Sequence, residues 1–253
     1  MINSQRKLSV VVPCFNEERT IGKVLKLVLA QPCVGEIVII NDCSTDNSLS
    51  IIEGVRDSRI KIINHEKNLG KGKSVSEGLK ASSLPFVVIQ DADLEYDPAE
   101  YTLLLEPILE NRADVVYGSR FLSGKSRRVL YYWHSVGNSL LTTFSNIFTN
   151  LNLTDMETCY KLMTREVALS LNLQEARFGI EPEITAQIAA FKVRIYEVAI
   201  SYYGRTYEEG KKINWKDGFS ALRCIVKYNL RSRRVNYKKI FDLNHTPNSI
   251  IEK

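Results

Sequence analysis

At residues 86–95 the chain reads FVVIQDADLE, an uninterrupted apolar run followed by three carboxylates. Apolar runs without polar alternation are typical of strands covered on both faces of a sheet. The first half of the chain contains further β-branched runs, with amphipathic segments typical of helices between them. Strands are predicted at 8–13, 36–41, 60–64, 86–90 and 114–118. Helices are predicted at 20–29, 46–55, 71–81 and 98–111. This alternation predicts an α/β fold with a mostly parallel sheet flanked by helices.

The second half of the chain has a different rhythm. Residues 129–154 contain no Lys, Arg, Asp or Glu, and their large apolar residues recur at helical spacing. The long helix that this pattern predicts has a wide apolar face, which either joins the core or meets lipid or a lipid-linked substrate. Further elements are predicted as a helix at 181–190, a strand at 194–199 and a helix at 217–229.

No linker or internal repeat divides the 253 residues, so we expect one domain over residues 1–230 and a basic tail over 231–253. The formal net charge is +5, but residues 211–253 hold 11 Lys and Arg against 3 Asp and Glu, so the rest of the chain is net negative. A basic terminal stretch suggests an anionic partner such as a membrane surface or nucleic acid, or is simply a solvated tail.

The composition excludes several classes of protein. With 44% hydrophobic and 25% charged residues, the chain is neither disordered nor collagen-like. No apolar stretch approaches the roughly 18 residues of a spanning helix, and no signal region precedes the first strand. Five widely spaced cysteines without a C-x-x-C pair are expected to be reduced thiols. We therefore expect a cytoplasmic protein, in contact with a membrane only peripherally and at its inner face.

Polar residues follow three of the predicted strands, at 13–18, 41–46 and 91–95. Ligands of open α/β sheets bind beyond the carboxyl ends of the strands. Asp91 and Asp93 should emerge from one strand end facing the same way, and two like charges so close need a cation. Mg²⁺ or Mn²⁺ bound there would bridge them to a substrate diphosphate. An isolated Asp-x-Asp can instead be a turn that caps the helix beginning at Pro98.

Six motifs in this order make the chain resemble the family 2 glycosyltransferases of the GT-A fold, which transfer sugars from nucleotide diphosphates. The resemblance covers roughly residues 7–215 and is greatest to the dolichyl-phosphate mannosyltransferase, or polyprenyl-phosphate sugar synthase, branch. The motifs are VVVPCFNEE (10–18), INDCSTDNS (40–48), NLGKGKS (68–74), QDADLEYDP (90–98), GSRF (118–121) and EEGKKI (208–213).

The resemblance implies a nucleotide site in the first two motifs. Pro13, Phe15 and Glu17 match the first nucleotide contact loop of the family. Ile40 and Asp42 match the positions that hold the base, where an Asp would accept a hydrogen bond from a ring N–H of uracil or guanine.

The resemblance also implies a metal site. Asp91, Ala92 and Asp93 match the metal and diphosphate motif, and Asp93 is thereby expected to act in catalysis. Glu95 stands where the branch usually has Gln and would add a third oxygen ligand to Mg²⁺ or Mn²⁺.

Basic residues matching phosphate contacts complete the implied site. Arg120 matches an arginine that faces the phosphates at the reacting centre, whereas Arg205 and Lys211 match later residues that clamp a donor or acceptor phosphate. Asp155 matches an acid of the branch and, with Glu157, is a candidate general base, although it could equally cap a helix or pair with a lysine.

The implied function is inverting transfer of a sugar from GDP-mannose or a UDP-sugar to a polyprenyl phosphate of the dolichyl type, catalysed by a metal-dependent hexosyltransferase. A phosphate acceptor is already anionic and needs no general base, whereas a hydroxyl acceptor does. Two alternatives remain: transfer to a sugar hydroxyl in polysaccharide or cell-envelope glycan synthesis, and a non-catalytic nucleotide-sugar-binding protein. The resemblance gives no reason to expect a nucleic-acid partner.

Overall fold

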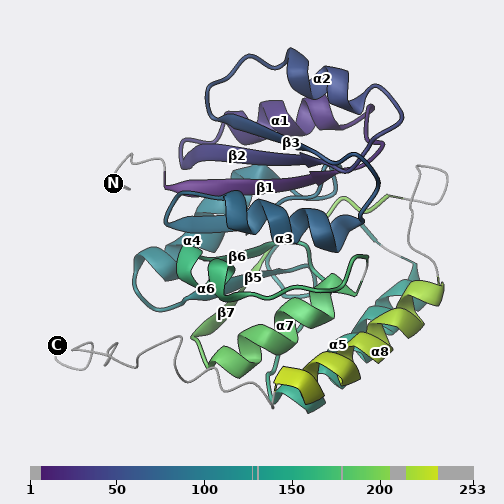
Figure 1. Ribbon diagram of the computed structural model, residues 1–253. Coiled ribbons are helices and arrows are strands. Elements are labelled where there is room, and N and C mark those ends of the chain that lie inside the picture. The colour runs from purple at the N-terminus through teal and green to yellow at the C-terminus, as the bar shows by residue number, and fades with distance from the viewer. Residues whose placement is uncertain (1–6, 127, 130, 178, 206–214, 233–253) are drawn as a thin grey trace, which may run out of the picture.

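A seven-stranded sheet with the order β3-β2-β1-β4-β6-β5-β7 forms the centre of the computed structural model (Figure 1). The structure describes residues 7–126, 128–129, 131–177, 179–205 and 215–232. The strands are β1 (Leu8–Cys14), β2 (Val34–Asn41), β3 (Ile60–Asn64), β4 (Phe86–Ile89), β5 (Val115–Ser119), β6 (Lys161–Thr164) and β7 (Ile195–Ala199). All neighbouring pairs are parallel except those that β6 makes with β4 and β5. The predicted α/β fold with a mostly parallel sheet is confirmed.

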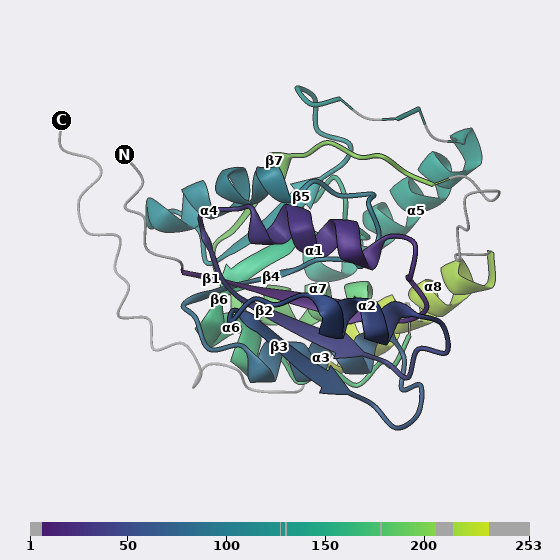
Figure 2. The ribbon, with the colours of Figure 1, turned by 90° about the horizontal axis from the view of Figure 1, so that it is seen from above.

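Helices cover both faces of the sheet, with α3 and α6 on one and α1 and α4 on the other (Figures 1 and 2). The helices are α1 (Ile21–Leu29), α2 (Ser48–Gly54), α3 (Lys71–Ala81), α4 (Tyr101–Leu109) after the 3₁₀ turn η1 (Pro98–Glu100), α5 (Tyr132–Thr149), α6 (Arg165–Ser170), α7 (Ile180–Phe191) and α8 (Trp215–Ser232). Coverage of both faces explains why β1 and β2 are almost wholly apolar and buried.

The antiparallel strand β6 and the helix α6 were not predicted. A four-residue strand that starts with a lysine carries too weak a pattern to be recognised in the sequence. Its direction matters for the site: because β6 runs opposite to β4 and β5, its amino-terminal end lies at their carboxyl ends. Residues 155–160, which lead into β6, therefore join the edge of the sheet where ligands are expected.

The long uncharged helix exists as α5, and its apolar face is divided between the two predicted roles. Leu141, Phe144 and Phe148 pack against the core, whereas Trp133 (76% exposed) and Ile147 (70% exposed) face outward. Helix α8 lies beside α5, beyond the carboxyl ends of the strands (Figures 1 and 2). Among the described residues, no helix combines the length and the hydropathy needed to cross a membrane.

The predicted boundary of the domain at residue 230 falls within α8, which continues to Ser232. The division into one domain and a tail remains a prediction, since residues 233–253 lie outside the described part of the chain.

Gly78 allows α3 to pack closely on the sheet, because a Cβ at this position would overlap Val11 of β1 and Ile40 of β2. We expect Gly78→Ala to lower the free energy of unfolding by about 1–3 kcal/mol through overpacking of the core. Denaturant unfolding measures this change. Gly54→Ala is the matched control, since a Cβ on Gly54 meets nothing within 4 Å; equal destabilisation by both variants would contradict the close packing of α3.

Candidate functional site

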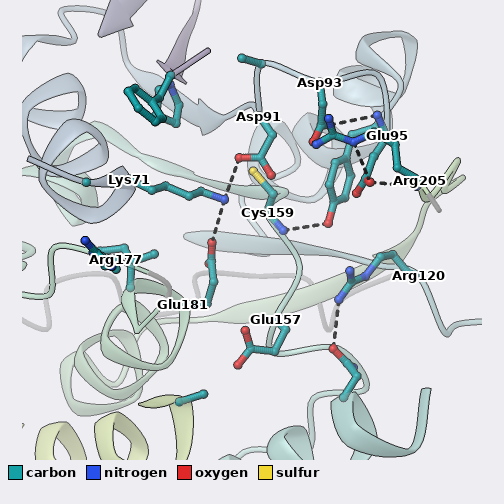
Figure 3. A pocket seen from close by; sticks show the side chains of 18 of the residues that line it. Lys71, Asp91, Asp93, Glu95, Arg120, Glu157, Cys159, Arg177, Glu181 and Arg205 are labelled. Carbon is teal, nitrogen blue, oxygen red and sulfur yellow. Dashed lines mark hydrogen bonds and ion pairs between the residues drawn. The ribbon is translucent and has the colours of Figure 1, made fainter. Parts of the chain in front are cut away.

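A cavity of about 880 Å³ opens at the carboxyl ends of β1, β2 and β4 and extends to α5 and α8. Its wall combines acids, bases and apolar groups from segments far apart in the sequence (Figure 3). Of the predicted site residues, it brings together Pro13, Phe15, Glu17, Asp42, Asp91, Ala92, Asp93, Glu95, Arg120, Glu157 and Arg205.

Asp91 emerges from the end of β4 and pairs with Lys71, the first residue of α3, at 2.7 Å between Nζ and Oδ1. Burial opposes both charges, yet the attraction between them keeps the pKa of Lys71 above its ordinary value and that of Asp91 below it. Lys71 also lies 3.7 Å from Glu181 of α7 (Figure 3). The ammonium group therefore links two carboxylates that would otherwise repel each other across the cavity.

Asp93 pairs with Arg205, whose Nη2 lies 2.6 Å from Oδ2. Burial raises the pKa of Asp93 to about 7, with further contributions from Asp91 and Glu95 that outweigh the opposing effect of Arg205. The carboxyl group of Asp93 is therefore surrounded by more negative than positive charge, and an added cation would stabilise its ionised form.

Glu95, expected as a third metal ligand, is bound to Arg205 and Tyr202. Its Oε1 accepts hydrogen bonds from the backbone N–H and Nε of Arg205, and its Oε2 accepts one from the hydroxyl of Tyr202. Within the described ranges, no three His, Cys, Asp or Glu side chains converge as a metal cluster. The third oxygen ligand expected at Glu95 stays a prediction.

Two carboxylates nevertheless fit a hard divalent cation that completes its shell with water and a diphosphate, as Mg²⁺ and Mn²⁺ do. Asp91 and Asp93 leave the same strand end two residues apart, both line the cavity, and each already faces a positive group. Their surplus charge suits an added cation.

Asp155 is not placed to act as a general base, because it is fully buried beneath Arg120. Its two oxygens accept hydrogen bonds from Nε (2.6 Å) and Nη2 (2.7 Å) of Arg120, and Asn138 of α5 contacts both partners. Burial opposes the charge on Arg120, but Asp155 holds the pKa of the guanidinium above its ordinary value. Asp155 is a positioning residue that fixes a cation at the cavity wall.

Asp42 and Ile40 depart from the expected contact with a base. The carboxylate of Asp42 accepts hydrogen bonds from Nδ1 of His65 and from the backbone N–H groups of Leu69 and Gly70, which fixes the loop before α3. Ile40 is fully buried, and its side chain points toward Gly78 in the core. Of these two side chains only that of Asp42 reaches the cavity wall, and its oxygens are already engaged.

The first motif forms one wall of the cavity. Phe15 is 38% exposed there, and Glu17 accepts a hydrogen bond from Thr20 and lies 3.5 Å from Arg205. The carbonyl of Ala92 accepts from the same threonine hydroxyl, which ties this loop to the end of β4. Lys211, predicted as a phosphate contact, lies outside the described residues.

Basic residues in or next to the cavity were missed by sequence reasoning. Arg177 lines the cavity near the start of α7; buried Lys161 pairs with Glu181 and donates to the carbonyl of Thr158. The motif NLGKGKS offered a signal for Lys71, since Gly70 and Gly72 stand on either side of it: a Cβ on either glycine would strike the backbone of residues 175–176. That contact joins the start of α3 to the segment before α7.

Known proteins with a similar sequence include glycosyltransferases. Glycosyltransferase AglJ of Haloferax volcanii is 26% identical over 78% of this chain and 63% of its own length. A dolichyl-phosphate beta-glucosyltransferase of Trichomonas vaginalis, ALG5D, is 24% identical over 92% of this chain and 77% of its own.

Among solved structures, glucosyl-3-phosphoglycerate synthase from Mycobacterium tuberculosis, crystallised with Mn²⁺, UDP-glucose and phosphoglyceric acid, superposes with a TM-score of 0.68 at 19% identity, over 90% of this chain and 79% of that one. This likeness identifies the fold as the GT-A fold. The model of the family described as "Glycosyl transferase family 2" matches residues 9–171, well over half of the sequence. This chain therefore belongs to glycosyl transferase family 2.

Proposed function

We propose that this protein is a metal-dependent hexosyltransferase that moves a sugar, with inversion, from GDP-mannose or a UDP-sugar to a polyprenyl phosphate of the dolichyl type. One observation carries the proposal: a single cavity is lined by the carboxylate pair Asp91 and Asp93, by Arg120, and by residues of α5 and α8, two helices that also expose apolar side chains. The dolichyl-phosphate glucosyltransferases among the relatives support the choice of acceptor.

The donor end suits a diphosphate. Asp91 and Asp93 would hold Mg²⁺ or Mn²⁺, which when bound neutralises negative charge on the departing nucleoside diphosphate. Lys71 and Arg205 stand beside these carboxylates and can turn toward phosphate oxygens. Phe15 offers an exposed ring to the base.

The acceptor end suits an anion attached to an apolar chain. Arg120 is held rigidly by Asp155 and would orient the attacking phosphate oxygen at the anomeric carbon. A phosphate acceptor is already ionised near neutral pH, so no proton has to be removed. This agrees with the burial of Asp155, which leaves it unable to serve as the base.

The apolar surface of α5 and α8 would rest on the membrane that carries such an acceptor. Its exposed side chains belong to the two helices and the approach to α5, namely Val129, Tyr131, Tyr132, Trp133, Leu140, Ile147, Phe219, Leu222 and Leu230. Arg223, Lys227 and Arg231 of α8 would favour anionic lipid, as would the basic residues beyond it. Peripheral attachment at the inner face would bring the cavity to the lipid phosphate.

Replacing either metal-facing carboxylate tests the donor end. We expect Asp91→Asn and Asp93→Asn each to lower kcat/KM by about 100-fold or more, because charge on the leaving diphosphate is no longer balanced. The measurement is sugar transfer from UDP-glucose or GDP-mannose to a short-chain polyprenyl phosphate with Mn²⁺. Asp114→Asn, at the opposite end of β5, is the control and should retain activity; full activity of both site variants would refute a role for the carboxylate pair.

A double-mutant cycle tests the link between Asp155 and Arg120. We expect Arg120→Gln to lower kcat by about 100-fold, and Asp155→Asn to lower kcat because Arg120 loses its fixed orientation. The double variant should be no slower than Arg120→Gln alone, since both changes remove one function. Additive losses would mean that Asp155 acts on the reaction independently of Arg120.

Vesicle sedimentation tests the apolar surface. We expect the double change Trp133→Ser with Ile147→Ser to weaken binding to vesicles of equal parts phosphatidylcholine and phosphatidylglycerol by at least about 10-fold, because two large side chains no longer enter the lipid. Leu109→Ser with Leu169→Ser removes two exposed leucines on α4 and α6 and should change nothing. Equal loss in both pairs, or in neither, would rule out this surface.

A further inference from the structure

Glu157 stands in the segment that leads into β6 and lies at the cavity wall between Glu181 and Arg120 (Figure 3). Its Oε1 is buried and, in the part of the chain that the structure describes, has no hydrogen-bond partner. A buried carboxylate oxygen without a donor is costly, since it gives up water and gains nothing in return.

The charged groups around Glu157 do not satisfy it. Lys161 of β6 is bound to Glu181 and to a backbone carbonyl. Arg120, after β5, directs Nε and Nη2 at Asp155. Burial raises the pKa of Glu157 to about 7, and the negative charges of Glu181 on α7 and of Asp155 add to this effect. The surrounding protein thus provides cations nearby but no donor for this oxygen.

A neutral polar group that enters the cavity would supply the missing donors. Glu157 lines the same cavity as Asp91, and Cys159, two residues after Glu157, is next to Asp91. A sugar attached to a diphosphate held at Asp91 would extend in this direction, and its hydroxyl groups are neutral hydrogen-bond donors.

We propose that Glu157 accepts hydrogen bonds from hydroxyl groups of the transferred sugar, and so makes the site prefer a nucleotide sugar over the bare nucleotide. The inference rests on the proposed function and adds to it the residue that recognises the sugar. A site built to bind a hydroxyl strongly rejects a ligand that lacks it, because its own polar group is then left unpaired.

The same argument predicts a conflict between stability and binding at this position. In the folded protein Glu157 retains its proton up to about pH 7, whereas in the unfolded chain it loses the proton near its ordinary pKa. Between these two values the unfolded chain binds fewer protons, so Glu157 makes the folded state less stable as the pH rises. Removing the carboxyl group should therefore stabilise the protein at pH 8 and have much less effect at pH 5.

Glu157→Leu tests the inference, since leucine is of comparable size and has no acceptor. Titration calorimetry with Mn²⁺ gives the dissociation constants of UDP and UDP-glucose, and of GDP and GDP-mannose, for wild type and variant. For the variant we expect the dissociation constant of the nucleotide alone to stay within about 2-fold of the wild-type value. The ratio of the dissociation constant of the sugar nucleotide to that of the nucleotide alone should rise at least about 10-fold. The variant should also melt at a higher temperature than wild type at pH 8.

Glu183→Gln is the control, because Glu183 is a buried acid of α7 whose carboxylate accepts hydrogen bonds from the backbone N–H groups of Gln174 and Glu175. It should lower the melting temperature and leave the ratio of the two dissociation constants unchanged. If Glu157→Leu also leaves that ratio unchanged while wild type binds a sugar nucleotide, the role of Glu157 is overturned and the proposed function stands. If wild type binds none of the four ligands, both are overturned.

Discussion

Acidic side chains crowd one edge of the sheet, and the site depends on how their charges are balanced. Four of these carboxylates are each paired with a lysine or arginine from another part of the chain, in the pairs Lys71–Asp91, Arg205–Asp93, Lys161–Glu181 and Arg120–Asp155. Paired in this way, buried charges can be kept in a cavity open to a ligand. Asp93 and Glu157, where the balance is incomplete, are the places where a ligand has most to contribute.

The parallel part of the sheet could be predicted because each of its strands can be recognised from its own residues. Strands covered on both faces must be apolar throughout, and the runs in β1, β2 and β4 satisfy this requirement without reference to the rest of the chain. Ligands of such sheets bind beyond the carboxyl ends of the strands, so Asp91 and Asp93 could also be predicted to line a cavity.

Roles that depend on long-range contacts were not predictable from the sequence. The sequence around Asp155 is compatible with a base, a cap or an ion pair, and only the contact with Arg120, 35 residues earlier, decides among them. Lys71 lies in a recognised motif at the start of α3, yet its partner Asp91 comes from the end of β4. Ile40 was expected at a base contact, but the alternation of side chains along β2 directs it into the core.

Because β6 runs antiparallel to its neighbours, the segment that leads into it lies at the cavity. Side chains along this segment alternate between the core and the cavity. Met156 and Thr158 are fully buried, whereas the residues between and after them, Glu157 and Cys159, face the cavity. The backbone here is thus anchored at every second residue while the alternate side chains are free to differ. In a related protein, replacement of one side chain that faces the cavity would change the specificity for the sugar, while the buried residues and the sheet stay the same.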